Sequence, residues 1–377
     1  MKIGFDAKRA FQNKTGLGNY SRSFIRSLLE KESSNQLYLF TPKISEAGAE
    51  LTADKRYHVI QPHKTIHKFL PSYWRSHGLL GDLKELGIEI FHGLSNELPV
   101  GIERLNVKKV VTIHDLIFLR FPELYPPIDR KIYQRKFKAA IEKADLVIAC
   151  SRQTASDIQE FYQVNPNKIQ VVYQDCYSMF NNRYTDIQHH EFKAKYQLNQ
   201  TYILSVGTLE KRKNQLNLLK AFHRADLKNI QLVFLGKKAD LYAEMDLYIQ
   251  ENKLQNKLVF LDQLNENELP LLYQNAISFA YVSRFEGFGI PILEALRSGV
   301  PVLASNVSSL PEVAGNAALY AHPDDIEAMK NHLIKLSQNA DLRAEMITNG
   351  YKQAELFNAD ILAEQVLTLY KSLLNKV

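Results

Sequence analysis

The feature that most constrains this chain is a regular alternation of short apolar runs with segments of helical spacing. In the first half, the apolar runs are Ile3–Asp6, Leu37–Phe40, Tyr57–Ile60, Ile88–Phe91, Lys109–Ile113 and Asp145–Ala149. Short apolar runs between polar loops are typical of parallel strands that are buried on both faces. Asn19–Leu29 and Lys131–Lys143 have helical spacing between them. The alternation predicts a doubly wound α/β domain.

The same pattern restarts in the second half of the chain. Its expected strands are Tyr202–Val206, Gln231–Leu235, Leu258–Leu261, Ala276–Val282 and Pro301–Ala304, with a helix over Gln215–Phe222 after the first. Each half therefore opens with a strand, a glycine turn and a helix. We expect domains over residues 1–180 and 201–358, joined by a polar linker over 181–200. A last helix is expected over 359–377, with a return to the first domain as one option.

Composition and charge exclude several classes of protein. No run of 18 apolar residues is present, and Cys150 and Cys176 are too few for a disulfide framework or a cysteine zinc site. The first residues read as a strand rather than a signal peptide, so we expect a cytoplasmic protein. Residues 1–180 hold 26 Lys and Arg against 19 Asp and Glu, and the remainder holds 21 against 22. The basic first half suits phosphorylated ligands or an anionic membrane surface. No nucleic acid is expected, because the cations form no aromatic-interleaved motif.

The most informative motif follows the expected strand Ala276–Val282. Gly287 and Gly289 allow backbone amides to approach a ligand, and Pro291 suits the first turn of a helix. The amides of Phe288 to Ile290 would then form an anion site at the start of that helix. Glu286 precedes the helix, and Glu294 lies within it among apolar residues, where a buried carboxylate needs a partner. The alternative is that these acids only complement the helix dipole.

The stretch Glu286-Gly-Phe-Gly-Ile-Pro-Ile-Leu-Glu294, followed by Ala304-Ser-Asn-Val-Ser-Ser-Leu-Pro-Glu312, resembles the retaining family 4 glycosyltransferases. That family has the GT-B architecture, in which two Rossmann-like domains face a central cleft. The resemblance implies that Glu286 contacts the donor sugar. It also implies that Glu294 binds the ribose hydroxyls of a nucleotide.

Three further loops follow strands of the second half. Gly207, Arg212 and Lys213 follow the first strand, and paired cations suit a diphosphate, although such a run is often a solvated surface. Lys211 stands where the family usually has proline. Gly236 and Lys237 either line the donor cleft or form a plain turn. By the resemblance, Gln263 and Leu264 border the nucleotide base.

In the first half, two loops are candidate site segments. Gly16 and Gly18 lie at a strand-to-helix turn, and the family resemblance places such a loop beside the donor phosphates and the acceptor. A plain turn is the alternative. His114 and Asp115 follow the strand Lys109–Ile113; the resemblance implies that the histidine touches the donor sugar, whereas local hydrogen bonding is the alternative. His92 is a weaker candidate for the acceptor side.

The segment His63–Arg75 mixes basic and aromatic residues. It suits an interfacial element that inserts Trp74 and Phe69 while Lys64, Lys68 and Arg75 meet anionic lipid. An acceptor-binding loop and ordinary packing are the alternatives.

The resemblance implies a retaining transfer of a hexose from a sugar nucleotide to a hydroxyl of a glycan. Bacterial mannosyltransferases of surface polysaccharide and lipopolysaccharide synthesis resemble the chain most, so GDP-mannose is the favoured donor and a polyprenyl-diphosphate-linked glycan the favoured acceptor. Glu286, His114, Arg212 and Lys213 are the candidate catalytic residues, and no divalent metal or other cofactor is expected. A sugar-nucleotide epimerase and a non-catalytic sugar-nucleotide-binding protein are the alternatives.

Overall fold

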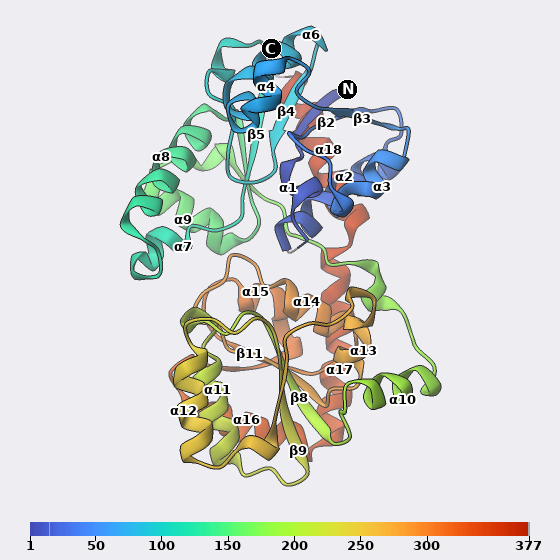
Figure 1. Cartoon of the computed structure of the whole chain (residues 1–377), viewed down its shortest axis with the longest axis vertical. Helices are drawn as coiled ribbons and strands as arrows, with labels where there is room; N and C mark the ends of the chain where they lie inside the picture. The colour runs from blue at the N-terminus through green and yellow to red at the C-terminus, as the bar shows by residue number, and fades with distance from the viewer. Residues whose placement is uncertain (15, 376–377) are drawn as a thin grey trace. The chain divides into compact units, whose positions relative to one another are not determined.

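The computed structural model describes residues 1–14 and 16–375. The chain forms two compact units, one made of Met1–Asp175 with Phe357–Val377 and the other of Cys176–Leu356. Figure 1 shows both as α/β units, with the last helix, drawn in red, lying among the blue N-terminal elements.

The first unit is built on a seven-stranded parallel sheet with the order β3-β2-β1-β4-β5-β6-β7. The strands are β1 Lys2–Asp6, β2 Gln36–Phe40, β3 Tyr57–Ile60, β4 Ile90–Gly93, β5 Lys108–Ile113, β6 Leu146–Ala149 and β7 Ile169–Val171. The strand order reverses between β1 and β4, since β1 pairs with β2 on one side and with β4 on the other. In an open α/β sheet, ligands bind outside the carboxyl ends of the strands at such a reversal.

Helices cover both faces of this sheet (Figure 1). They are α1 Lys8–Gln12, α2 Gly16–Lys31, α3 Ala49–Ala53, α4 Thr65–Phe69, α5 Pro71–Tyr73, α6 Leu79–Glu85, α7 Ile117–Arg120, α8 Pro127–Lys143, α9 Arg152–Tyr162 and α18 Ala359–Asn375. A π-helical turn, η2 Trp74–Gly78, joins α5 to α6. α18 packs beside α2 and buries Val366, Leu367 and Tyr370 in the same apolar core as β1 and β2.

The second unit is built on a six-stranded parallel sheet with the order β10-β9-β8-β11-β12-β13. Its strands are β8 Thr201–Val206, β9 Ile230–Leu235, β10 Leu258–Leu261, β11 Ser278–Tyr281, β12 Val302–Ser305 and β13 Ala318–Ala321. Its helices are α10 Asp186–Lys195, α11 Gln215–Ala225, α12 Tyr242–Glu251, α13 Leu269–Gln274, α14 Ile290–Arg297, α15 Leu310–Ala314, α16 Ile326–Gln338 and α17 Ala340–Ala354. Here the strand order reverses between β8 and β11, which are neighbours in the sheet.

Residues 181–200 are not a linker between the units. The division between the units falls at Asp175 and Cys176, and the expected linker contains α10, which belongs to the second unit. Thr185 caps α10 with a reciprocal capping box, and Phe192 is its one buried side chain. A helix with a single buried residue has no apolar stripe, so its sequence resembles that of a polar loop.

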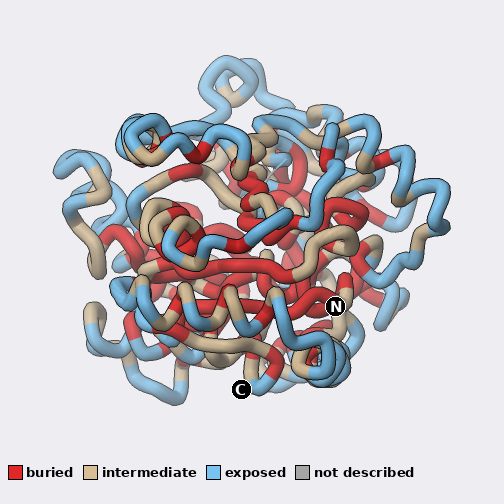
Figure 2. Tube along the Cα trace, turned by 90° about the horizontal axis from the view of Figure 1, so that it is seen from below, coloured by how far each residue is buried: buried red, intermediate tan, exposed pale blue. Residues whose placement is uncertain are grey.

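All the strands expected from apolar runs are present, with ends that shift by one or two residues. Figure 2 shows the segments buried inside the units in red and the outer helices and loops largely exposed. The sequence analysis missed β7 and β13, which each lie at an edge of a sheet. Both are only partly buried. Gln170 interrupts the apolar run of β7, whereas β13 is a short apolar run that was overlooked.

The interfacial role expected for Trp74 and Arg75 is wrong. Trp74 is 0% exposed, and its indole nitrogen donates to Asp82 Oδ2 at 2.7 Å. The Arg75 guanidinium is bound to Asp6 and Glu97. Phe69 is 80% exposed, and Lys64 and Lys68 are exposed as expected. Among the described residues, no helix is long and apolar enough to cross a membrane.

Candidate active site

The loops after β8 and β11 bring the expected donor-binding residues together at the strand-order reversal of the second sheet. After β8, the turn η7 Lys211–Lys213 presents two cations, and Asn214 then adopts a left-handed backbone with φ 61° ahead of α11. The Asn214 amide donates to the carbonyl oxygens of Val282 and Pro323. These bonds tie the β8 loop to the end of β11, so its cations face the Glu286 loop.

Glu286 binds both cations directly. Its Oε2 lies 2.8 Å from Arg212 Nη1, and its Oε1 lies 2.6 Å from Lys213 Nζ. The Tyr281 hydroxyl donates to the same Oε1 at 3.0 Å and accepts from Lys213 Nζ at 2.5 Å. Arg212 also donates to the Phe285 carbonyl and to Glu210. The result is a compact cluster of two cations, one carboxylate and one phenol.

The electrostatics of the cluster keep Glu286 ionised. Its side chain is only 10% exposed, and burial alone would raise its pKa. Lys213 and Arg212 outweigh burial and lower the pKa of Glu286 to about 2. Burial lowers the pKa of Lys213, whereas the acidic neighbours of Arg212 raise its pKa above the usual range. Glu286 is therefore a fixed negative charge and not a proton donor near neutral pH.

Two serines hold the loop that carries Glu286. The Glu286 amide donates to Ser308 Oγ at 3.1 Å. The Ser309 hydroxyl, which is fully buried, lies within hydrogen-bonding distance of the Glu286 and Phe288 carbonyls. Sequence reasoning missed Tyr281, Ser308 and Ser309, although both serines belong to the Ala304–Glu312 stretch that carries the family resemblance.

Glu294 has a different environment from Glu286. It lies one turn into α14, where Ile292, Leu293, Ala295 and Leu296 are buried but Glu294 itself remains partly exposed. The Tyr273 hydroxyl donates to its Oε2 at 2.8 Å. Burial without a cation raises the pKa of Glu294 to about 7, although the bond from Tyr273 opposes that rise.

Gly207 and Gly236 follow strands, and Gly289 precedes α14. Of these three glycines, Gly236 and Gly289 leave no room for a side chain. A Cβ on Gly236, whose φ is +155°, would lie 2.1 Å from the Gly207 carbonyl oxygen. The ends of β8 and β9 therefore approach closely, which supports the plain-turn alternative for Gly236. Gly289 precedes α14 with φ +118°, and a Cβ there would meet Leu310. Such a backbone is accessible chiefly to glycine.

The other residues expected to bind the donor lie in the Glu286 loop and in the loops after β9 and β10. Gly287 and Phe288 continue the Glu286 loop, and Ile290 is the first residue of α14. Lys237 is exposed beyond β9, with its carbonyl accepting from the Leu209 amide. Gln263 and Leu264 lie in the loop after β10, Gln263 exposed and Leu264 partly buried. Their contacts with phosphate, ribose or base remain predictions.

His114 and His92 are buried in the first unit. His114 Nε2 lies 2.8 Å from the Leu94 carbonyl, and its Nδ1 lies 2.8 Å from the Gln174 side-chain amide. Burial lowers the pKa of His114 to about 4, so the ring is neutral. His92 is 0% exposed between Thr112 and Tyr370, a position that leaves no route to an acceptor. The role of His92 on the acceptor side is therefore wrong, whereas that of His114 remains a prediction.

Gly16 and Gly18 lie in the first turn of α2. A Cβ on Gly18 would approach the Asn13 carbonyl oxygen to 1.8 Å, whereas nothing lies near a Cβ on Gly16. Gly18 thus has a packing reason to be glycine, and contact of either residue with a phosphate remains a prediction. Within the described ranges 1–14 and 16–375, no three His, Cys, Asp or Glu side chains are grouped to hold a metal ion.

Two α/β units, each built on a parallel sheet with a strand-order reversal, are the components of the GT-B fold. Solved structures agree on the fold. WaaG, a glycosyltransferase involved in lipopolysaccharide biosynthesis, gives a TM-score of 0.71 at 17% identity over 98% of this chain and 99% of its own. HepE from Anabaena, in complex with UDP, gives a TM-score of 0.77 at 15% identity over 99% of this chain and all of its own.

Sequence comparison shows the family. Residues 15–174 match the model for Glycosyltransferase Family 4, and residues 186–353 match that for Glycosyl transferases group 1. The O-antigen chain mannosyltransferase B of Escherichia coli is 30% identical over 99% of this chain and all of its own. The O-antigen chain mannosyltransferase RfbU of Salmonella typhimurium is 27% identical over 62% of each chain. The chain belongs to the family 4 glycosyltransferases and is a glycosyltransferase.

Proposed function

We propose that this enzyme transfers mannose from GDP-mannose to a hydroxyl of a bacterial surface glycan, with retention at the anomeric carbon. Support for the sugar comes from the O-antigen mannosyltransferases of Escherichia coli and Salmonella typhimurium, to which the chain is similar over most of its length. Support for a nucleotide donor comes from HepE, which shares the fold and was solved with UDP.

The observation that carries the proposal is the binding of Glu286 to both Arg212 and Lys213 beside the start of α14. A diphosphate leaving group gains negative charge in the transition state, and the sugar ring gains positive charge. Two fixed cations next to one fixed carboxylate match that separation of charge before the reaction begins. Arg212 and Lys213 would bind the diphosphate, Glu286 would face the sugar, and Glu294 would bind the ribose.

The proposed reaction balances without a separate base. The bond from the anomeric carbon to the diphosphate oxygen breaks, and a bond to the acceptor oxygen forms on the same face of the sugar. The acceptor proton passes to the departing phosphate oxygen. Glu286, with a pKa of about 2, remains ionised throughout and stabilises the positive sugar ring.

The donor is tested by incubating the purified enzyme with GDP-mannose, UDP-glucose, UDP-N-acetylglucosamine and a dTDP-sugar. We expect GDP-mannose to raise the melting temperature most and to be the donor consumed, because a ligand that binds the native state stabilises it. NMR of the product should show the α-anomer. Since cations replace a metal at the diphosphate, activity should survive EDTA. Preferred use of a UDP-sugar would overturn the donor assignment, and loss of activity in EDTA with rescue by Mn²⁺ would overturn the diphosphate site.

We also propose a cytoplasmic location, with peripheral contact of the first unit with the anionic membrane face. Cys150 and Cys176 are buried and are not joined in a disulfide, which is compatible with a reducing compartment. Lys64, Lys68 and Phe69 are exposed and available for such contact. Co-sedimentation with phosphatidylglycerol vesicles, and its loss at high salt, would support this location; no binding at low salt would contradict it.

A further inference from the structure

Glu210 is a carboxylate of the candidate active site that has no role in the proposed reaction. It directly precedes η7, and its Oε1 lies 2.5 Å from Arg212 Nη2. The Glu210 side chain is 33% exposed and that of Arg212 is 15% exposed, so water screens the pair only in part. Glu210 therefore acts on the charge of a residue that is proposed to bind the diphosphate.

The backbone on both sides of the pair fixes its position. Leu209, which precedes Glu210, is buried, and its amide donates to the Lys237 carbonyl at 2.9 Å. The Arg212 carbonyl accepts from the Arg284 amide at 2.8 Å. The folded loops therefore hold the Glu210 carboxylate and the Arg212 guanidinium together, unlike two long side chains that meet on an open surface.

The cluster to which Glu210 belongs has no formal net charge. Arg212 and Lys213 supply two positive charges, and Glu286 and Glu210 supply two negative charges. Burial lowers the pKa of Arg212, but Glu286 and then Glu210 raise it above the usual range. Glu210 thus stabilises the positive charge of Arg212 and at the same time occupies one of its nitrogen atoms.

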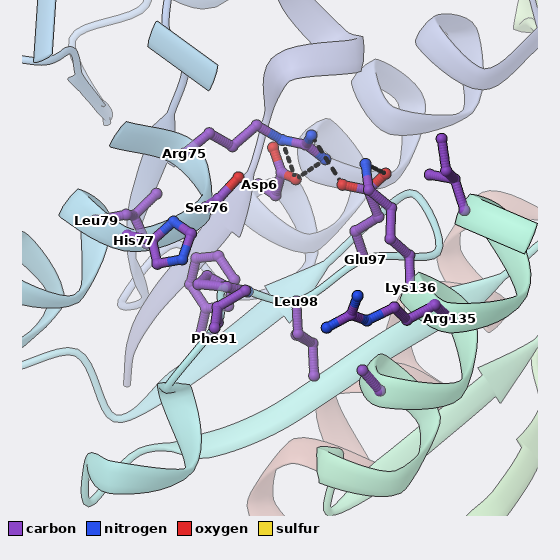
Figure 3. A pocket seen from close by; sticks show the side chains of 14 residues that line it. Asp6, Arg75, Ser76, His77, Leu79, Phe91, Glu97, Leu98, Arg135 and Lys136 are labelled. Atoms are coloured by element: carbon purple, nitrogen blue, oxygen red, sulfur yellow. Dashed lines mark hydrogen bonds and ion pairs between the residues drawn. The ribbon is translucent and has the colours of Figure 1, made fainter. Parts of the chain in front are cut away.

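A carboxylate beside a largely buried cation can also serve the fold alone. Figure 3 shows such a network in the first unit, where Arg75 lies 2.7 Å from Asp6 and 3.0 Å from Glu97. Lys136 lies 3.2 Å from the other oxygen of Glu97. This network also joins two cations to two carboxylates, but the proposed reaction gives its cations no ligand. Arg212 differs, because the proposed reaction gives it a diphosphate to bind.

A diphosphate that binds Arg212 meets the charge of Glu210 in one of two ways. It shares the guanidinium and is repelled by the carboxylate, or it displaces the carboxylate, which then loses its cation. Both lower the affinity, and the repulsion grows with the charge of the ligand. A free terminal phosphate has a second pKa of about 6, so near neutral pH it carries more negative charge than the same phosphate esterified to a sugar. Glu210 therefore weakens the product more than the donor.

We propose that Glu210 is a positioning residue that acts through Arg212 to favour release of the nucleoside diphosphate product. Glu210 balances one of the two cations, so the site binds the donor less tightly than it otherwise would and the more highly charged product less tightly still. Product release limits turnover in many enzymes, and a residue of this kind speeds that step. This inference rests on the proposed function and adds the control of product release to it.

Glu210→Gln tests the proposal, because it removes the charge and keeps an oxygen that accepts from Arg212. The full chain is titrated with GDP, UDP and GDP-mannose by calorimetry, and the dissociation rate of GDP is measured by surface plasmon resonance. We expect the Kd of GDP to fall about tenfold and that of GDP-mannose about threefold, as for the loss of one nearby like charge. The dissociation rate of GDP should fall with its Kd.

Two matched variants serve as controls. Glu244→Gln removes a carboxylate that lies 3.4 Å from Lys211, where both side chains are more than half exposed, and should leave all affinities unchanged. Glu97→Gln breaks the network of Figure 3 and should lower the melting temperature without changing the affinity for GDP. An equal gain in GDP affinity in Glu244→Gln would assign the effect to the overall charge and overturn the proposal.

The remaining outcomes separate this inference from the proposed function. Unchanged or weaker GDP binding in Glu210→Gln would overturn the inference alone, because Glu210 would then only support the loop. An equal gain for GDP and GDP-mannose would overturn the assignment to product release. If the wild-type chain bound UDP but not GDP, the donor assignment would fail, and tighter UDP binding in Glu210→Gln would still support the role of Glu210. If it bound neither nucleotide, the proposed function and this inference would both fail.

Discussion

Glu286 and Glu294 belong to one motif, with seven residues between them, yet their surroundings move their pKa values in opposite directions. Two cations hold the pKa of Glu286 at about 2, whereas burial beside Tyr273 raises that of Glu294 to about 7. Two carboxylates whose pKa values differ in this way perform different tasks near neutral pH. Glu286 supplies a constant charge, and the charge of Glu294 depends on pH.

We expect donor binding to weaken as pH falls through 7. In the role proposed for Glu294, its carboxylate accepts hydrogen bonds from the ribose hydroxyls. The ionised fraction of a group with a pKa of about 7 falls about tenfold between pH 8 and pH 6. The donor KM should rise by about the same factor over that range, with a smaller change in kcat. In Glu294→Gln the KM should be high and independent of pH. A donor KM that stays flat in the wild type would contradict this role.

At the scale of elements, the site depends on loops after β8, β11 and β12 rather than on the strands themselves. Ser309, at the start of α15, lies within hydrogen-bonding distance of two carbonyls of the Glu286 loop. The segment around β12 thereby fixes where the Glu286 carboxylate points. Small displacements of a positioned group are costly in catalysis.

Ser309→Ala should lower kcat by about tenfold to a hundredfold, because the Glu286 loop loses its support. The free energy of unfolding should fall by about 1–3 kcal/mol, since a buried carbonyl loses its donor. Tyr202→Phe is the control, because the Tyr202 hydroxyl donates a similar buried bond to the Leu272 carbonyl, in the same unit but outside that loop. It should cost similar stability with little loss of kcat. Equal loss of kcat in both variants would show that Ser309 acts only through stability.

The sequence predicted the central strands and the main donor loops because these signals are local. An apolar run indicates a strand that is buried on both faces. A glycine or a cation that directly follows a strand is expected to lie at the carboxyl edge of the sheet. Tyr281 and Ser309 could not be predicted in this way, because their roles depend on the distance to Glu286 in the folded chain. The membrane-facing position predicted for Trp74 was wrong for the same reason. Its hydrogen-bond partner Asp82 is eight residues away, and the sequence does not show that the two side chains are in contact.

At the scale of the whole molecule, the chain ends in the unit in which it begins. Tyr370 of α18 places its hydroxyl 2.5 Å from His92 Nδ1, across 278 residues of sequence. His92 lies at the end of β4, in the centre of the first sheet, with its other nitrogen on Thr112. The last helix therefore completes the core of the first unit.

Tyr370→Phe should lower the free energy of unfolding of the first unit by about 1–3 kcal/mol, because a buried histidine nitrogen loses its partner. Trp74 is the only tryptophan and lies buried in this unit, so its fluorescence during urea unfolding reports the change. Tyr73→Phe, which alters an exposed ring, is the control and should have no effect. Unchanged stability in Tyr370→Phe would contradict the contribution of α18.

We propose Glu286, held by Arg212 and Lys213, as the catalytic carboxylate of a mannosyl transfer. The most direct test is to measure kcat and the donor dissociation constant for Glu286→Gln with GDP-mannose. We expect kcat to fall by about a hundredfold to a thousandfold with donor affinity nearly kept, because the lost interaction forms in the transition state. A near-normal kcat in Glu286→Gln, with the loss found instead in Glu294→Gln, would contradict it.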